Sequence, residues 1–373
     1  MKSKFKKILG IHIFMILNFC DCNSLVFGQS KAFFLGHSLI NFNVPNMTNR
    51  LAEAANKDFV YKRNIGNGAN LLFHHTNPFS PGSQGDVWKT TMPQGGFTDF
   101  IFTEAVPLKG HLQWSKTYEY ADSFATYFRK YNTDSRIFLY ETWHCIKSGT
   151  PEGCEWEDDD KDPWTTRLKN DHALWKGIVN HLKTKNHKDV YLIPAGQAFI
   201  KLDEEIRKGN LPEINNVFDL FSDDIHLTNI GNYFIACLMY GAIFKETPLG
   251  LPSRLKDEYE VLYSVFPTNE QAKVLQDVAW QTICESEISG VNCSITQVEE
   301  LPKTLSASIV FEQGKISFDE KFDRVEIFSL SGQRLSSCIQ CEELALPFVV
   351  SSMNIVKMIK GPESINKLVF IQL

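Results

Sequence analysis

From residue 31 to about residue 245, short apolar runs alternate with longer amphipathic stretches. The apolar runs predict β-strands over Ala32–Leu35, Phe59–Asn64, Phe100–Thr103, Arg136–Thr142 and Val190–Pro194. The stretches between and after them predict helices over Pro45–Lys57, Tyr118–Tyr131, Trp164–Lys185 and Thr228–Phe244. Strands that alternate with helices in this way are typical of a parallel sheet with helices on both faces. We therefore predict a three-layer α/β/α domain.

The pattern changes in the C-terminal part of the chain. Residues 251–294 are helical and amphipathic in places, as in Asn269–Glu285, and we expect them to extend the same domain. Beyond about residue 300, period-two alternation appears, for example in Val325–Leu330, followed by a turn at 331–333. This pattern predicts a small β-sandwich. The predicted domains are therefore residues 29–300 and 301–373.

The N-terminus has the pattern of a transport signal. Several lysines precede an apolar run at Ile8–Phe19, which is short for a membrane span but typical of the core of a signal peptide. The segment Val26-Phe27-Gly28 offers a small residue for cleavage, so the predicted signal peptide covers residues 1–28. Lipidation at Cys20 is the alternative.

Composition excludes some classes of function. The hydrophobic fraction of 43% and the charged fraction of 22% are ordinary for a globular protein. A net charge of −6, without clustered Lys and Arg, argues against a nucleic-acid partner because phosphate neutralisation needs such clusters.

The cysteine spacing predicts disulfides in an oxidising compartment. The pairs expected from spacing are Cys145 with Cys154 and Cys284 with Cys293, while Cys338 and Cys341 either pair or stay reduced. Cys237 lies in an apolar helix and is expected to be buried. No cysteine has zinc-ligand neighbours at the right spacing, so we expect no metal site.

Two segments carry the residues of a serine nucleophile site. Residues 31–39 read KAFFLGHSL, which places Ser38 just beyond the first predicted strand, where ligands bind in parallel sheets. Residues 221–233 read FSDDIHLTNIGNY, which places Asp223 three residues before His226. A serine hydroxyl needs an imidazole to take its proton, and the imidazole needs a carboxylate to orient it.

These segments resemble the first and last blocks of the SGNH/GDSL hydrolase superfamily. The resemblance implies that Ser38 is the nucleophile, His226 the general base and acid, and Asp223 its orienting partner, with the adjacent Asp224 as the alternative. It also implies an oxyanion hole built from the backbone N–H groups of Ser38 and Gly68. Gly66 is the alternative in the same NIGNGAN segment, and no cofactor is implied.

The third block departs from the family pattern, Gly-x-Asn-Asp, whose Asn side chain binds the oxyanion. Residues 104–107 read EAVP instead, and an ionised Glu104 cannot donate to an oxyanion. Three explanations remain open. The N–H groups of Ser38 and Gly68 suffice, or Glu104 is protonated or binds a substrate hydroxyl, or Asn67 or Asn70 donates instead.

Two further features bear on the substrate. Trp143 follows a predicted strand, and it either forms a wall that stacks on a sugar or packs beneath the site. The acidic stretch Glu152–Asp162 is expected to be a solvated loop. An ion site, for which the EF-hand spacing is missing, and a contact with a cationic substrate are its alternatives.

The C-terminal segments VEIFSLSGQRL (325–335) and NKLVFIQL (366–373) resemble the sorting domain of the Bacteroidetes type IX secretion system. That resemblance implies export to the cell surface through this secretion machinery; an accessory β-domain is the alternative. The sequence thus predicts a secreted serine esterase that deacetylates a polysaccharide, with an acylated carbohydrate as its substrate. A lipase or phospholipase, or a decayed carbohydrate-binding protein, are the other hypotheses.

Overall fold

The computed structural model describes residues 29–154, 161–293, 309–312, 315–329, 334–345, 352–360 and 363–371. The chain divides into two compact units, Met1–Cys293 and Ser294–Leu373, which we describe separately. The predicted signal peptide at 1–28 and the predicted domain boundary at residue 300 lie outside the described residues.

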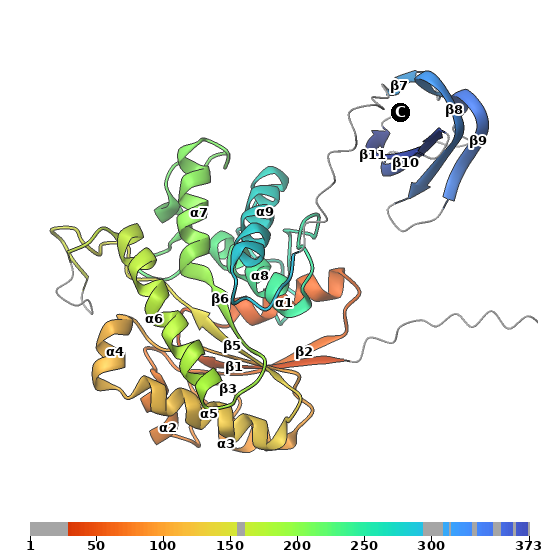
Figure 1. The fold of residues 1–373 in the computed structure, drawn as a ribbon. Coiled ribbons are helices and arrows are strands. Elements are labelled where there is room, and N and C mark those ends of the chain that lie inside the picture. The colour runs from red at the N-terminus through yellow and green to blue at the C-terminus, as the bar shows by residue number, and fades with distance from the viewer. Residues whose placement is uncertain are drawn as a thin grey trace, which may run out of the picture. The chain divides into compact units, whose positions relative to one another are not determined.

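Strands and helices alternate along the first unit (Figure 1). The strands are β1 (Ser30–Gly36), β2 (Phe59–Ile65), β3 (Gln84–Gly85), β4 (Asp99–Phe102), β5 (Arg136–Glu141) and β6 (Val190–Pro194). The helices are α1 (Asn43–Ala54), α2 (Leu71–Thr76), α3 (Trp88–Thr91), α4 (Leu108–Trp114), α5 (Thr117–Tyr131), α6 (Trp164–Thr184), α7 (Ala195–Arg207), α8 (Asn229–Phe244) and α9 (Asn269–Glu285), with 3₁₀ turns at Met92–Gln94 and Val217–Leu220. Every predicted strand and helix of this unit has a counterpart, whereas α2, α3, α4 and α7 were not predicted.

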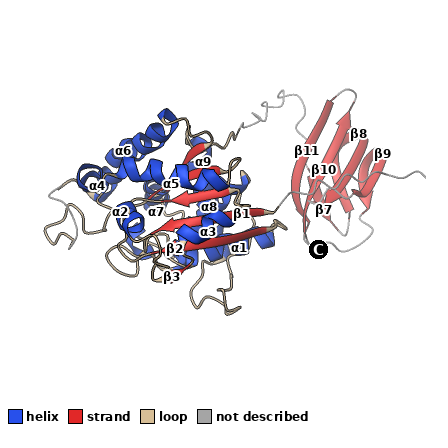
Figure 2. Ribbon diagram, turned by 90° about the horizontal axis from the view of Figure 1, so that it is seen from below, coloured by secondary structure: helices blue, strands red, loops and turns tan. Residues whose placement is uncertain are grey.

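The strands form one sheet in the order β3-β2-β1-β4-β5-β6, in which the last five are parallel and β3 is antiparallel to β2. Helices cover both faces (Figure 2). Along β1, Ala32 and Phe34 enter the core beneath α1, α7, α8 and α9, while Phe33 and Leu35 enter the core beneath α2–α6. Burial on both faces explains why the strand is a continuous apolar run. The predicted helix-covered parallel sheet is confirmed.

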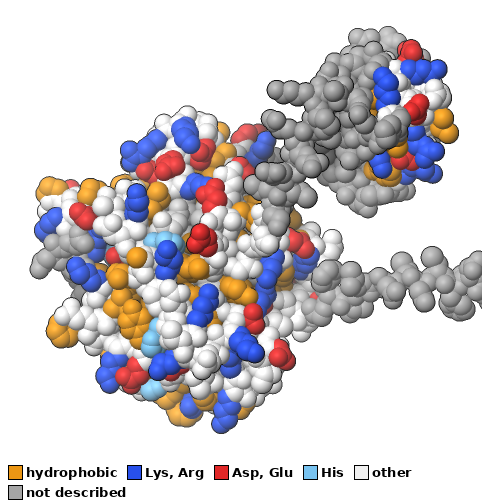
Figure 3. Space-filling model, viewed as in Figure 1, with side chains coloured by type: hydrophobic (Ala, Val, Ile, Leu, Met, Phe, Trp, Pro, Cys, Tyr) orange, Lys and Arg blue, Asp and Glu red, His pale blue; other side chains and the backbone are white. Residues whose placement is uncertain are grey.

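Charged side chains are mixed on the outside of this unit. Figure 3 shows Lys and Arg interspersed with Asp and Glu over the visible face, without a large region of one sign among the described residues there. This distribution agrees with the absence of clustered basic residues in the sequence.

The second unit is an antiparallel sheet. Its strands are β7 (Ile309–Glu312), β8 (Lys315–Ser329), β9 (Arg334–Ala345), β10 (Ser352–Lys360) and β11 (Glu363–Ile371). The long β8 pairs with β9 along one edge and with β7 and β10 along the other, so the described strands stay in one five-stranded sheet. The predicted antiparallel β-fold is confirmed, but the two separate sheets of a sandwich are not seen among these strands. The predicted turn at 331–333 lies outside the described residues.

Candidate active site

Ser38 lies just beyond the carboxyl end of β1, near the middle of the parallel sheet. Gly36 ends the strand, and a Cβ there would come within 2.7 Å of the side chains of Ile40 and Thr103. The chain then turns tightly, with the N–H of Ile40 donating to the carbonyl of His37 at 3.0 Å. A glycine followed by this turn therefore presents Ser38 above the sheet edge, as the sequence predicted.

The loop before α8 carries both other residues of the predicted catalytic group. Phe221 and Leu227 pair as an isolated β-bridge and close the loop. Inside it, the Asp223 Oδ1 accepts hydrogen bonds from the N–H of Ile225 at 2.8 Å and of His226 at 2.7 Å. The side chain of Asp223 is thereby fixed by the backbone of the same loop.

The structure brings Ser38, His226 and Asp223 into one row of hydrogen bonds. The Ser38 Oγ lies 2.9 Å from His226 Nε2, and His226 Nδ1 lies 2.8 Å from Asp223 Oδ2. Partial burial acts to raise the pKa of Asp223, but hydrogen bonds from the backbone of His226 and Ile225 and from the His226 ring outweigh it and lower the pKa. An ionised Asp223 keeps the imidazole proton on Nδ1, so Nε2 can accept the serine proton.

The alternative carboxylate, Asp224, has a different partner. Its Oδ2 forms an ion pair with Lys147 Nζ at 3.1 Å. His226 therefore bonds to Asp223, the carboxylate three residues before it, as the sequence spacing predicted.

A cavity of about 650 Å³ opens beside Ser38 and His226. Most of its wall is apolar and consists of Leu39, Ala105, Val106, Pro107 and Ile225. The polar groups that reach it, besides Ser38 and His226, belong to His37, Asn67, Gly68 and His111. An apolar cavity with a few convergent polar groups is typical of a small-molecule site.

Gly68 is placed to serve as an oxyanion donor. It lines the cavity with φ of +64°, in the left-handed region that favours glycine, and a Cβ there would meet nothing within 4 Å. Its N–H has no acceptor among the described residues. The N–H of the alternative, Gly66, donates to the carbonyl of Gly36 at 2.9 Å. The geometry thus favours Gly68 over Gly66.

The structure corrects the predicted substrate contact of Glu104, which is fully buried. Its Oε1 accepts from the N–H of Leu71 at 3.1 Å and of Ala105 at 2.8 Å, and its Oε2 accepts from the Thr117 hydroxyl at 2.8 Å. Burial raises the pKa of this carboxyl. Glu104 therefore ties β4 to the start of α2 and does not reach the cavity.

The predicted substrate contact of Trp143 is also wrong, because this side chain is fully buried as well. Its ring lies 5.0 Å from that of Phe199 in an edge-to-face arrangement, and its Nε1 donates to the carbonyl of Ile225 at 2.8 Å. Trp143 therefore packs beneath the site, which was the alternative expectation from the sequence.

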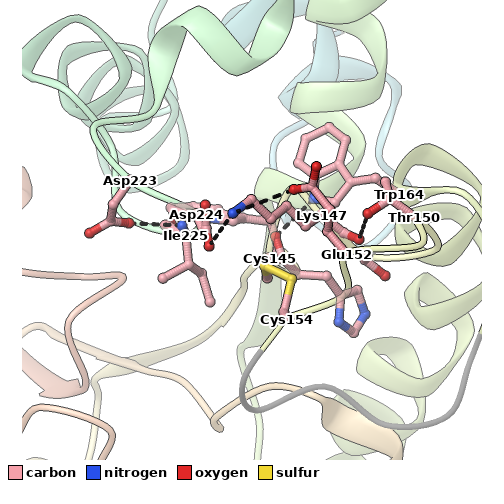
Figure 4. The surroundings of a disulfide bond; sticks show 12 residues. Cys145, Lys147, Thr150, Glu152, Cys154, Trp164, Asp223, Asp224 and Ile225 are labelled. Atoms are coloured by element: carbon pink, nitrogen blue, oxygen red, sulfur yellow. Dashed lines mark hydrogen bonds and ion pairs between the residues drawn. A yellow bond between two sulfur atoms is a disulfide. The ribbon is translucent and has the colours of Figure 1, made fainter.

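A disulfide-closed segment supports the same loop (Figure 4). Cys145 is bonded to Cys154, and between them the N–H of Ile146 donates to the carbonyl of Asp224 at 2.7 Å. Figure 4 shows Lys147 reaching between Asp224 and Glu152. The segment after β5 therefore holds the loop of the candidate triad through both backbone and side-chain contacts.

The described residues contain three disulfides and one free cysteine. The pairs Cys145–Cys154 and Cys284–Cys293 are confirmed, Cys338 and Cys341 are bonded, and Cys237 is buried and free. In the acidic stretch Glu152–Asp162, residues 155–160 lie outside the described part.

The described residues contain no group of three or more His, Cys, Asp and Glu able to hold a metal ion. Nor does any helix there have the length and apolar character that a membrane crossing requires.

Comparisons with known proteins bear on the fold. No protein-family model matches the sequence, and no curated protein matches it. Among solved structures, a DUF4886 family protein from Bacteroides uniformis is similar with a TM-score of 0.52 and 16% identity, over 69% of this chain and 95% of that one. A GDSL-like lipase from Parabacteroides merdae has a TM-score of 0.39 and 11% identity, over 58% and 96%. An acetyl xylan esterase from Butyrivibrio proteoclasticus has a TM-score of 0.28 and 11% identity, over 44% and 54%.

Of these three similarities, the first alone reaches the level of a shared fold, and at 16% identity it shows the fold and nothing more. Over 69% of its length, this chain has the α/β fold of that Bacteroides uniformis protein.

Proposed function

We propose that this protein is a serine esterase that hydrolyses carboxylic esters through an acyl-enzyme. The observation that carries the proposal is the row of hydrogen bonds from Ser38 Oγ to His226 Nε2 at 2.9 Å and from His226 Nδ1 to Asp223 Oδ2 at 2.8 Å. These residues come from two distant segments and meet at the wall of a cavity.

In the proposed reaction, Ser38 Oγ attacks the carbonyl carbon of the ester while His226 Nε2 takes the hydroxyl proton. The negative charge on the carbonyl oxygen is bound by the N–H groups of Gly68 and Ser38. When the C–O bond to the alcohol breaks, His226 returns the proton to the alcohol and an acyl-Ser38 ester remains. A water then loses a proton to His226 and attacks the acyl carbon; the bond to Ser38 Oγ breaks, His226 returns the proton to Oγ, and the acid leaves.

For the substrate we propose an acetylated polysaccharide. Trp114 is 77% exposed at the end of α4, one turn after the cavity-lining His111, and Phe73 is 44% exposed on α2. Exposed aromatic rings on these two helices provide flat apolar faces on which sugar rings can stack. Trp143 is buried and offers no such face.

We further propose that the protein is exported to the cell surface. Three disulfides among the described residues support an oxidising compartment. The signal-peptide pattern at residues 1–28 and the resemblance of the C-terminal segments to a type IX sorting domain point the same way.

A lipase or phospholipase is the second candidate, and the size of the cavity favours it. About 650 Å³ with mostly apolar walls is more space than an acetyl group fills. A longer acyl chain would bury more apolar surface there, and each additional buried CH₂ contributes about 0.8 kcal/mol.

The test compares the wild-type chain with Ser38→Ala on p-nitrophenyl acetate, butyrate and octanoate and on acetylated xylan. We expect acetate release by the wild type and none above background by Ser38→Ala. Equal rates for the two proteins would refute the esterase proposal. A kcat/KM that rises steeply with acyl length, without release from acetylated xylan, would favour the lipase. Binding of xylan without hydrolysis of any ester would favour a decayed binding protein.

A further inference from the structure

Three histidines line the cavity, and their ring nitrogens are engaged to different extents. His226 bonds through both nitrogens, to Ser38 and Asp223. His37 also uses both, because Nε2 donates to the carbonyl of Glu104 at 3.1 Å and Nδ1 accepts from the N–H of Leu39 at 3.4 Å. His111 is different: its Nδ1 is engaged, but no described residue provides a partner for its Nε2.

The neighbours of His111 determine which nitrogen carries the proton. The Asn70 Oδ1 accepts from the N–H of Phe73 at 2.8 Å, which identifies the other amide atom as the donor Nδ2. That Nδ2 lies 3.3 Å from His111 Nδ1 and 3.3 Å from Ser115 Oγ, and the Ser115 hydroxyl itself lies 3.0 Å from Nδ1. Because the Asn70 amide nitrogen can only donate, Nδ1 accepts, and the proton lies on Nε2. Burial lowers the pKa of His111, which keeps this neutral form at neutral pH.

The end of β4 provides no side-chain donor to the cavity. Glu104 is turned inward to the backbone of Leu71 and Ala105, and Ala105 contributes only a methyl group to the wall. Val106 and Pro107 lead from there into α4, which brings His111 to the same wall. Two other cavity-lining residues outside the triad have a side-chain N–H: that of His37 is already donated to the carbonyl of Glu104, and Asn67 is exposed on a turn.

We propose that His111 is an oxyanion donor: its Nε2–H binds the carbonyl oxygen of the ester as negative charge develops there, together with the N–H groups of Gly68 and Ser38. This inference rests on the proposed esterase function. Asn70 and Ser115 hold the ring in place before the substrate arrives, so donating requires little reorganisation. A fixed donor of this kind is worth about 10²–10³ in kcat. His111 would thus replace the side-chain donor that the EAVP segment lacks.

The test uses two substitutions that differ in whether a donor remains. His111→Leu removes the N–H, whereas His111→Gln places an amide N–H close to the position of Nε2. We expect His111→Leu to lower kcat on p-nitrophenyl acetate by about 10²-fold with KM changed little, and His111→Gln to recover most of the loss. Gln113→Leu, at an exposed position on the same helix, is the control for placing leucine on α4 and should retain the wild-type rate. Thermal unfolding of each variant checks that it is folded.

A second readout is the rate at which a fluorophosphonate labels Ser38, because the attack on phosphorus also places negative charge in the oxyanion hole. His111→Leu should slow labelling as it slows hydrolysis. A folded His111→Leu variant with wild-type kcat and labelling rate would overturn the inference. The inference would also be overturned if His111→Leu raised KM without lowering kcat. The same holds if Asn67→Ala lowered kcat by about 10²-fold and His111→Leu did not. If any of these results is obtained while the wild type is active and Ser38→Ala is inactive, the inference about His111 is wrong but the esterase proposal stands. If the wild type neither hydrolyses esters nor is labelled, both are wrong.

Discussion

The indole Nε1 of Trp143 donates to the carbonyl oxygen of Ile225 at a distance of 2.8 Å. Trp143 is a fully buried residue that follows β5, whereas Ile225 lies between Asp223 and His226. A side chain of the core therefore anchors the loop on which the imidazole and its carboxylate are carried.

Trp143→Phe should keep the packing but leave the Ile225 carbonyl without this donor. We expect the free energy of unfolding to fall by about 1–3 kcal/mol. We also expect kcat to fall by about tenfold, since a displacement of about 1 Å in a site can cost about 10²-fold. Trp88→Phe is the matched control, because its buried Nε1 donates to the carbonyl of His74 at 3.0 Å and its ring belongs to the core on the other face of the sheet. If both variants lose stability but neither loses activity, the anchoring role is wrong.

The two neighbouring carboxylates should differ sharply in their effect on catalysis. Asp223→Asn removes the acceptor that holds the His226 proton on Nδ1, so kcat should drop by about 10⁴-fold. Asp224→Asn breaks only the exposed ion pair with Lys147 and should change kcat less than about fivefold. Steady-state kinetics on p-nitrophenyl acetate would measure both, and a larger loss for Asp224→Asn would reverse the assignment.

Removing the Cys145–Cys154 disulfide should lower both stability and activity. The bond closes a loop with a sequence separation of 9 residues, and replacing both cysteines with serine should cost about 2–3 kcal/mol of unfolding free energy. Activity should fall as well because the N–H of Ile146, inside the closed segment, holds the backbone carbonyl of Asp224. The same replacement at Cys284–Cys293, which has the same separation, should reduce the melting temperature but leave kcat unchanged. Equal kcat losses in the two double variants would argue against a specific support of the loop.

Glu104 should tolerate glutamine far better than alanine. Glutamine retains a carbonyl oxygen for the N–H groups of Leu71 and Ala105, and its amide can donate to the Thr117 oxygen. Alanine leaves the two N–H groups and the Thr117 hydroxyl buried without an acceptor. Each unpaired donor should lower the free energy of unfolding by about 1–3 kcal/mol. Urea unfolding of the two variants would measure the difference, and similar midpoints would show that these bonds contribute little.

His74 should make the protein less stable in acid. This buried ring donates from Nε2 to the carbonyl of Gly36 at 2.9 Å, and burial lowers its pKa from the usual 6.5 to about 4. Between these two pH values the unfolded chain binds a proton at His74 and the folded chain does not. The stability contributed by this group is therefore complete above pH 6.5 and decreases by up to about 3 kcal/mol as the pH falls to about 4.

His74→Gln retains an N–H donor for Gly36 but does not titrate. The free energy of unfolding of the wild type, relative to this variant, should decrease between pH 6.5 and pH 4. A constant difference between the two proteins over that range would contradict the lowered pKa.

The main elements of the first unit were predictable because their signals are local. The apolar run at β1 and the 3.6-residue periodicity of α9 depend only on neighbouring residues, and both elements appear close to the expected positions. Helix α7 was missed, although Phe199, Leu202 and Ile206 repeat on one face. It begins directly after β6, so no polar segment separates the two elements in the sequence.

The candidate triad was also visible in the sequence, because Ser38 follows a strand end and Asp223 and His226 share one short loop. Their meeting across 188 positions is decided by the tertiary structure, because His226 lies on the loop before α8 and not at the end of a strand of the parallel sheet.

The roles of the residues around the candidate triad could not be predicted in this way. Glu104 and Trp143 follow strand ends as Ser38 does, yet the side chains of both are buried in the core. His111 was not predicted to be a site residue. The direction of a side chain depends on contacts between segments far apart in the chain, such as Asn70 with His111 or Trp143 with Ile225. The order of elements and the reactive residues can thus be inferred from local pattern and spacing. Which side chains face the cavity and which support it from the core emerges only when those distant segments pack together.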